Sequence, residues 1–209
     1  MKSLEKYIYE EIVPRYAAFD PAHREDHALT VIDQSLKLRA DAPSDITIDK
    51  EMLLTAAACH DLGLINGRDR HHLDSGEMIR SDARLREWFD PDQIETIDQA
   101  AEDHRASGKK EPRSIYGRIV AEADRIIDPE TIIRRTVQFG FSNYPGLTRE
   151  EHIKRAVSHL KEKYGRGGYL RLWIPWSDNA AKLSDLQDLI ADDEAVWAET
   201  ERIFEMIEN

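Results

Sequence analysis

The chain has 209 residues, of which 41% are hydrophobic and 33% are charged, and this composition excludes a disordered chain. No apolar stretch approaches the roughly 20 residues that span a bilayer, and the polar start of the sequence is unlike a secretory signal, so we expect no membrane partner. The formal net charge of -12, without a basic face, argues against a nucleic-acid polymer as partner, and the lone Cys59 permits no internal disulfide and favours the reducing cytoplasm.

Apolar residues recur at helical spacing along the whole chain, and no segment shows the alternation typical of a strand. The pattern predicts a first helix over about residues 3–18, with a break or kink at Pro14. A second helix is expected from about Pro21 to Arg39. Further helices are expected over about residues 50–60, 72–88, 90–106, 114–127, 130–138, 148–164 and 182–207.

Capping residues mark the starts of several of these helices. Asp49 and Ser114 stand where N-caps are expected, and Asp90 is followed by Pro91, which favours the first helical position. No repeat, low-complexity tract or sharp boundary interrupts the succession of helices. The sequence therefore predicts a single all-α domain over residues 1–209.

Four histidines and two aspartates are candidates for a metal site. They are His27, the doublet His60-Asp61, His72, His104 and Asp124. His60 shares a helix face with Leu53 and Ala57, and His104 and Asp124 lie on the apolar stripes of their own helices. An aspartate that faces inward is costly unless it is paired or bound to a metal. Because imidazole and carboxylate are ligands of divalent metals, we expect these residues to converge on a metal centre.

In this order the residues resemble the motif of the HD-domain superfamily of metal-dependent phosphohydrolases. The family pattern is an early histidine, a His-Asp doublet and a late aspartate, which His27, His60-Asp61 and Asp124 match. Members with two metals add two histidines, similar here to His72 and His104. The resemblance covers about residues 20–128. It implies an HD-domain helical bundle, with about residues 129–209 as additional C-terminal helices.

The resemblance implies two divalent metal ions. One would be held by His27, His60, Asp61 and Asp124, and the second by His72 and His104 with Asp61 bridging. A metal-activated hydroxide would then attack a small phosphorylated compound or nucleotide. The identity of the metal stays open among Mn, Fe, Mg, Zn, Ni and Co, and the oligomeric state is unknown.

Two further groups of residues are candidates for chemistry or substrate binding. His23 lies one helical turn before His27, so with the bridging Asp61 it is a candidate catalytic residue. Arg105, Lys109 and Arg125 could bind a substrate phosphate, with ordinary surface charge as an equally open interpretation.

Three classes of function remain open. The hydrolase could be a phosphomonoesterase, a phosphodiesterase or a pyrophosphohydrolase, although the sequence lacks the Gly-Tyr-Pro signature of cyclic-di-GMP phosphodiesterases. Some HD-fold proteins with a similar ligand set bind two irons and activate oxygen instead. A non-catalytic protein with a structural metal is the third class.

Overall fold

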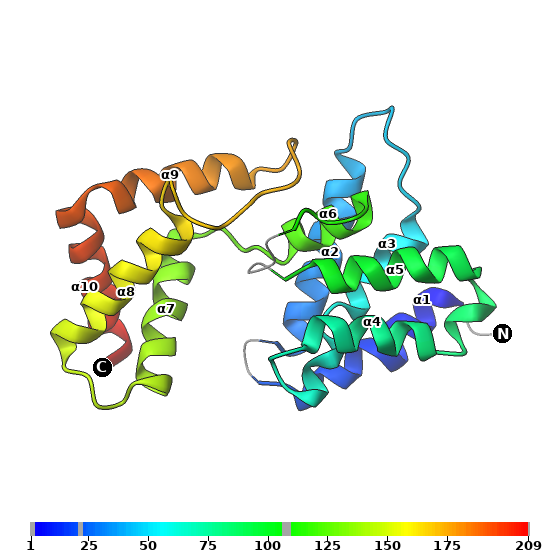
Figure 1. Ribbon diagram of the computed structural model, residues 1–209, viewed down its shortest axis with the longest axis horizontal. Coiled ribbons are helices and arrows are strands. Elements are labelled where there is room, and N and C mark those ends of the chain that lie inside the picture. The colour runs from blue at the N-terminus through cyan, green and yellow to red at the C-terminus, as the bar shows by residue number, and fades with distance from the viewer. Residues whose placement is uncertain (1–2, 21–22, 106–109, 209) are drawn as a thin grey trace. The chain divides into compact units, whose positions relative to one another are not determined.

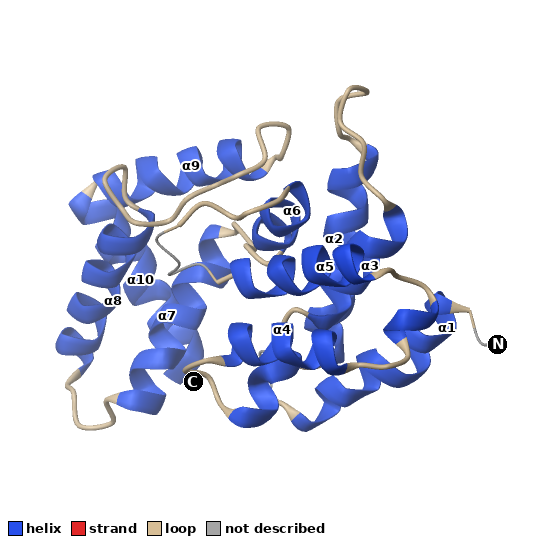
Figure 2. Cartoon of the chain, turned by 45° about the vertical axis from the view of Figure 1, so that its right-hand side comes forward, coloured by secondary structure: helices blue, strands red, loops and turns tan. Residues whose placement is uncertain are grey.

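The computed structural model describes residues 3–20, 23–105 and 110–208, and every regular element in this part of the chain is helical (Figures 1 and 2). The all-α prediction is confirmed. Contacts between Cα atoms divide the chain into two compact units. Unit 1 comprises Met1–Arg125 with Trp173–Ser177, and unit 2 comprises Ile126–Leu172 with Asp178–Asn209. The single domain over residues 1–209 stays a prediction.

Five longer helices make up most of the described part of unit 1, and short 3-10 segments lie between some of them. The helices are α2 (Glu25–Ala40), α3 (Lys50–Cys59), α4 (His71–Ser81), α5 (Pro91–Asp103) and α6 (Ile115–Ala123). The 3-10 segments are η3 (Leu62–Asn66) and η4 (Leu85–Glu87). Before them the chain passes through α1 (Leu4–Tyr7), a π-helical turn η1 (Ile8–Ile12) and a 3-10 segment η2 (Val13–Ala18). Pro14 lies in the first turn of η2, where a break was expected.

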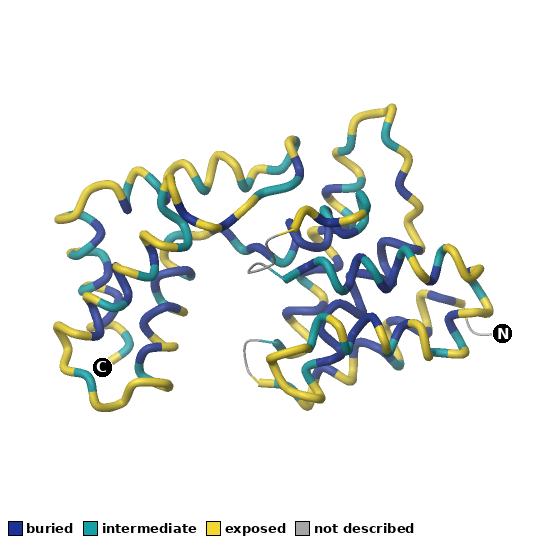
Figure 3. Tube along the Cα trace, viewed as in Figure 1, coloured by how far each residue is buried: buried dark blue, intermediate teal, exposed yellow. Residues whose placement is uncertain are grey.

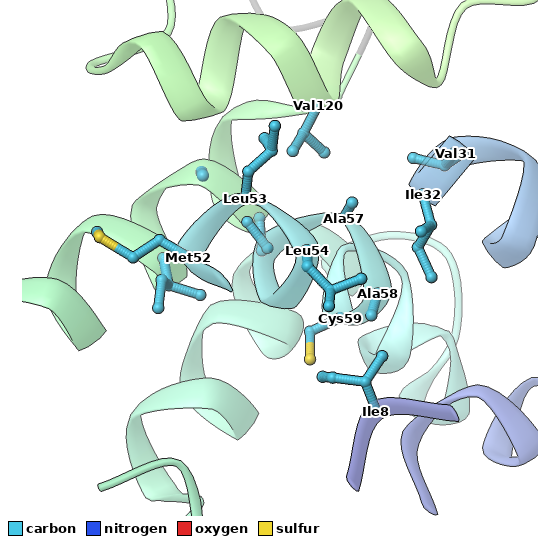
Figure 4. Close-up of a cluster of buried hydrophobic side chains, with 14 of the residues drawn as sticks. Ile8, Val31, Ile32, Met52, Leu53, Leu54, Ala57, Ala58, Cys59 and Val120 are labelled. Carbon is cyan, nitrogen blue, oxygen red and sulfur yellow. The ribbon is translucent and has the colours of Figure 1, made fainter. Parts of the chain in front are cut away.

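Helix α3 is the centre of unit 1. The Asp49 carboxylate accepts hydrogen bonds from the backbone N–H groups of Glu51 and Met52, so the helix begins where the cap was predicted. Every residue from Met52 to Cys59 is buried. In Figure 4, side chains of this helix lie among Val31 and Ile32 of α2, Ile8 of η1 and Val120, in one hydrophobic cluster. Fully burying one leucine of this kind stabilises the fold by about 1.5–3 kcal/mol, so the C-terminal end of α3 is firmly held.

The described part of unit 2 contains four helices with a core of its own. They are α7 (Pro129–Asn143), α8 (Arg149–Tyr164), α9 (Asn179–Ala191) and α10 (Asp193–Glu208). The single helix expected over about 182–207 is wrong, because Asp192 interrupts it. The Asp192 carboxylate accepts hydrogen bonds from the N–H groups of Glu194 and Ala195 and caps a new helix.

Three more helix ends differ from the prediction. The helix expected over about 130–138 continues to Asn143. The helix expected over 72–88 ends at Ser81, since Asp82 turns to extended backbone and accepts a hydrogen bond from Arg84 N–H. The helix expected to reach Ile127 ends at Ala123. Pro129 then opens α7, where it occupies the first helical position behind the cap Asp128.

The short segment Trp173–Ser177 belongs to unit 1, although it follows α8 in the chain. Ile174 is buried in the core of unit 1, and Trp176 donates its indole N–H to the carbonyl of Leu38 at 2.8 Å. The backbone N–H of Trp173 donates to the buried carboxylate of Glu122 at 2.8 Å.

Buried residues follow the inner faces of the helices, and the connecting loops are mostly exposed (Figure 3). Cys59 is one of the buried residues, and burial raises the pKa of its thiol to about 12. Cys59 is therefore a small residue of the core, with its thiol held in the protonated form. Among the described residues, no helix combines the length and apolar character needed to span a bilayer.

Candidate metal centre

Six polar side chains meet where the ends of five helices of unit 1 come together. His27 lies in the first turn of α2, His60 and Asp61 follow α3, and His71 begins α4. The other two, His104 and Asp124, directly follow α5 and α6. Apart from His71 and Asp124, these residues are at most 9% exposed, so the group lies inside the protein.

The carboxylate of Asp61 divides the cluster into two halves. Its Oδ2 lies 3.5 Å from Nε2 of His27 and 3.4 Å from Nε2 of His60. Its Oδ1 lies 3.4 Å from Nε2 of His71 and 3.3 Å from Nε2 of His104. Each carboxylate oxygen thus faces its own pair of imidazoles.

Asp124 belongs to the first of these halves. Its Oδ1 lies 3.3 Å from Nε2 of His27 and 4.0 Å from Nε2 of His60. Two imidazole nitrogens and one oxygen from each of two carboxylates therefore converge in this half. The second half has two imidazole nitrogens and Oδ1 of Asp61.

Backbone carbonyls set the tautomers of three of the histidines. Nδ1 donates to the carbonyl three residues earlier in His60 (to Ala57, 2.7 Å), His71 (to Arg68, 2.7 Å) and His104 (to Ala101, 2.5 Å). A carbonyl can only accept, so Nδ1 carries a proton, and whenever the ring is neutral the lone pair of Nε2 faces the cluster. This arrangement is typical of metal-binding histidines.

The electrostatics of the cluster call for positive charge at its centre. Burial would raise the pKa of Asp61, but the neighbouring histidines, His60 foremost, hold it well below its usual range. Burial alone would lower the pKa of His27. Hydrogen bonds to Asp124 and Asp61 outweigh that effect and raise the pKa of His27 to about 9. In this arrangement protons on imidazole supply the charge that balances the two carboxylates.

The donor set fits divalent metal ions. Ligand atoms of His27, His60 and Asp61 lie within 4.8 Å of one another, and so do those of Asp61, His71 and His104. The two Nε2 atoms of His27 and His60 are only 3.2 Å apart, a contact between lone pairs unless a proton or a cation lies between them. Mixed imidazole and carboxylate donors suit Zn, Mn, Fe, Co and Ni.

Comparison with known families agrees with this geometry. The sequence profile of the HD domain matches residues 24–127, a range that includes every member of the cluster. The chain belongs to the HD-domain superfamily. No curated protein and no solved structure matches the chain. The match ends close to the boundary near residue 128 that was predicted for the HD core.

Within the HD domain, the structure brings His71 to Asp61 where the sequence indicated His72. No hydrogen bond or ion pair of the described residues joins His72 to Asp61, and Nδ1 of His72 is buried without a partner. His72 was indicated by the resemblance to two-metal members of the family. The hydrogen bond from His71 Nδ1 to the Arg68 carbonyl turns the His71 ring inward at the helix start instead. The geometry thus replaces His72 by His71, and the ligand assignment itself stays a prediction.

Sequence reasoning also missed Tyr16, a fully buried tyrosine of η2 that holds the His-Asp doublet. Its hydroxyl donates to the carbonyl of Ala58 at 2.8 Å and accepts from the backbone N–H of Asp61 at 3.2 Å. Tyr16 therefore fixes the backbone on both sides of His60. No local motif marks this role, since it depends on a contact across 45 residues.

His23, the predicted catalytic histidine, lies beside the cluster. Its ring is perpendicular to that of His27, with centroids 5.5 Å apart. Nδ1 of His23 is hydrogen-bonded to the carboxylate of Asp20, and Nε2 lies 3.5 Å from a guanidinium nitrogen of Arg68. His23 does not lie on a helical turn before His27 as expected, because α2 begins only at Glu25. Its role in catalysis remains a prediction.

The three cations predicted to bind phosphate are placed differently from one another. Arg105 is half-buried and donates to the carbonyl of Asp69 at 2.8 Å, near the start of α4. Arg125 is 8% exposed and donates to the carbonyl of Ala121. Lys109 lies outside the described residues. Of these, Arg105 is the one whose surroundings agree best with contact to a substrate.

Proposed function

We propose that this HD domain is a metal-dependent phosphohydrolase that acts on a small phosphorylated compound or nucleotide. The proposal rests on the position of the Asp61 carboxylate between two pairs of histidines. One of its oxygens faces His27 and His60, and the other faces His71 and His104. A bridging carboxylate between two histidine pairs suits two metal ions a few ångströms apart, as in the two-metal centres of phosphatases.

The residues of the chain have separate tasks in this proposal. His27, His60, Asp61 and Asp124 would hold one ion, and His71 and His104 would hold a second with Asp61. Divalent ions at these positions supply a Lewis acid that polarises a phosphoryl oxygen and lowers the pKa of water. The hydrogen bonds to Ala57, Arg68 and Ala101 keep each imidazole in the ligating tautomer, so the ligands need not reorganise.

Substrate binding would fall to residues around the cluster. Arg105, next to the start of α4, offers a guanidinium that can form paired hydrogen bonds to a phosphate, and Arg125 and Lys109 remain candidates. His23, which is oriented by Asp20 and contacts the ring of His27, is proposed to carry a proton to or from the substrate.

The test separates hydrolysis from oxygen activation, the other chemistry that such a ligand set permits. The protein is loaded with Mn or Mg, freed of iron, and assayed without oxygen against p-nitrophenyl phosphate, bis(p-nitrophenyl) phosphate and nucleoside triphosphates. We expect release of phosphate, pyrophosphate or nitrophenol. No turnover on any of these, together with oxygen consumption by the iron-loaded protein, would assign an oxygenase instead.

A further inference from the structure

Unit 1 contains a cavity of about 360 Å³ whose lining is charged. It is lined by the C-terminal part of α4, the η4 turn, α5 and the segment before α6, and its volume is in the range of small-molecule sites. Asp98 lies six residues before His104, which is about 9 Å along a helix axis. The part of the cavity around Asp98 is therefore separate from the His/Asp cluster.

Part of the charge around this cavity is satisfied within the protein. Glu102 accepts from Arg80 at 2.9 Å and from Arg113 at 2.7 Å. Arg113 also forms hydrogen bonds to Asp103. Gly76 permits this arrangement, because a Cβ there would lie 2.7 Å from Cγ of Glu102. These side chains therefore have charged partners within the protein and need no ligand.

Asp98, by contrast, is left incomplete. Its side chain is almost fully buried, with the residue 1% exposed, and its Oδ1 pairs with Arg80 at 3.0 Å. Its Oδ2 is buried without a hydrogen-bond partner. An unpartnered carboxylate oxygen inside a protein costs on the order of 1–3 kcal/mol. Burial raises the pKa of Asp98 to about 6 in spite of Arg80, which agrees with a carboxylate that lacks one donor.

Two charges at the cavity lack a charged partner among the described residues. The guanidinium of Arg86 donates to the backbone carbonyl of Arg80 and pairs with no carboxylate there. The carboxylate of Glu95 accepts from the amide of Gln99 and pairs with no cation. The residues that line the cavity therefore include a buried carboxylate that lacks a donor, a cation without a charged partner and an anion without one. A simple anion would meet Asp98 and Glu95, and a bare cation would meet three arginines.

We propose that this cavity binds a small zwitterion of the amino-acid class, whose ammonium group donates to Asp98 Oδ2 and whose carboxylate pairs with Arg86. An ammonium group has three donors, enough to reach both Asp98 and Glu95. A guanidinium can hold a carboxylate through two parallel hydrogen bonds. The proposal is independent of the reaction at the metal centre.

The experiment uses the full chain loaded with Mn and titrates each of the twenty standard L-amino acids by isothermal calorimetry. We expect at least one to bind with a stoichiometry of one. Arg86→Ala and Glu95→Gln, both at exposed positions, should weaken that binding by at least about tenfold. Asp98→Asn should do the same, and Arg135→Ala, an exposed arginine of α7, should leave it unchanged.

Two results would contradict the proposal. If none of the amino acids binds at millimolar concentration, the proposal is wrong. It is equally wrong if binding survives undiminished in Arg86→Ala, a variant whose side chain is exposed and whose folding is checked by circular dichroism. Metal content of the variants is measured alongside and should equal that of the wild type, so a failure here is distinguishable from a failure of the proposed hydrolase.

Discussion

Asp61 is the residue on which both halves of the proposed centre depend. Each of its carboxylate oxygens faces a different pair of imidazoles, so Asp61→Ala removes a ligand from both halves at once. We expect metal content to fall towards zero and activity to fall by at least about 10³-fold, given the several kcal/mol of charge stabilisation that metals provide. Metal analysis of the purified variant is the measurement, with the exposed Asp33→Ala of α2 as the control. Retention of two ions in Asp61→Ala would contradict the bridge.

His71 and His72 form a matched pair of neighbours for testing the second half. His71→Ala should lower the metal stoichiometry by one, because Nε2 of His71 faces Oδ1 of Asp61 at 3.4 Å. His72→Ala should leave the stoichiometry unchanged, since no contact of the described residues joins it to Asp61. Both variants are assayed under metal-replete conditions. The reverse pattern would restore His72 as the ligand.

At this scale the sequence was informative about residue types and weak about orientation. The ordered set of His27, His60-Asp61, His104 and Asp124 was predicted from inward helical positions and converges as expected. His71 was not, because at a helix start the ring direction is set by a hydrogen bond to a loop carbonyl and not by helical register. Tyr16 was not either, since its contacts join distant parts of the chain.

At the scale of elements, the packing of η3 against α4 sets the position of His71. Gly63 approaches α4 so closely that a Cβ would lie 2.1 Å from the carbonyl oxygen of His71 and 2.6 Å from the backbone nitrogen of Ser75. Its N–H donates to the Ser75 hydroxyl at 2.9 Å. Gly63→Ala must therefore separate the two elements, with a loss of about 1–3 kcal/mol of unfolding free energy or more.

Denaturant unfolding measures that loss. The control is Gly146→Ala, because a Cβ at Gly146 meets nothing within 4 Å. The Gly63 variant should also bind less metal in the half that contains His71. Unchanged stability and metal content in Gly63→Ala would show that α4 is free to move away without consequence.

The contact of α4 with α5 gives a prediction about pH. Burial raises the pKa of Asp98 from 3.8 to about 6, against the pull of Arg80. The folded chain then binds a proton more readily than the unfolded chain, so the contribution to stability is full below about pH 4 and is lost as the pH rises through about 6. Asp98→Asn cannot titrate. The wild type should gain unfolding free energy relative to Asp98→Asn as the pH falls from about 7 to about 5.

Paired unfolding curves of these two proteins at several pH values give that difference, in which the other titrating groups largely cancel. If the wild type instead loses unfolding free energy relative to Asp98→Asn as the pH falls, the ion pair with Arg80 dominates and the pKa of Asp98 lies below its ordinary value.

The elements that could be predicted are those with a local signal at their start. Asp49, Asp90 and Ser114 each accept a backbone hydrogen bond at a helix start where a cap was expected. Helix ends were less predictable, because an aspartate within a helical pattern, such as Asp192, caps a new helix only if its side chain turns back to the backbone. An aspartate that caps a new helix and one that lies within a continuous helix have the same sequence pattern.

At the scale of the whole molecule, the His/Asp cluster lies within unit 1, and the core of unit 2 is built from separate apolar residues. A metal that binds only the folded protein adds stability that grows with its concentration, about 2.7 kcal/mol at a hundred times its dissociation constant. Because the ligands lie at the ends of α2, α3, α5 and α6 and at the start of α4, the gain should fall on those helices.

Hydrogen exchange with and without a chelator tests where that stability resides. Removing metal should speed exchange of backbone amides near the C-terminal ends of α3 and α5, where His60 and His104 lie, by a factor that reflects the lost binding energy. Amides of α8 in unit 2, which carries no member of the cluster, serve as the internal control. In Asp61→Ala the chelator should change neither set, because there is no metal to remove. If metal protected both units equally in the wild type, its effect could not be a local one on these helix ends, and the two units would have to open together.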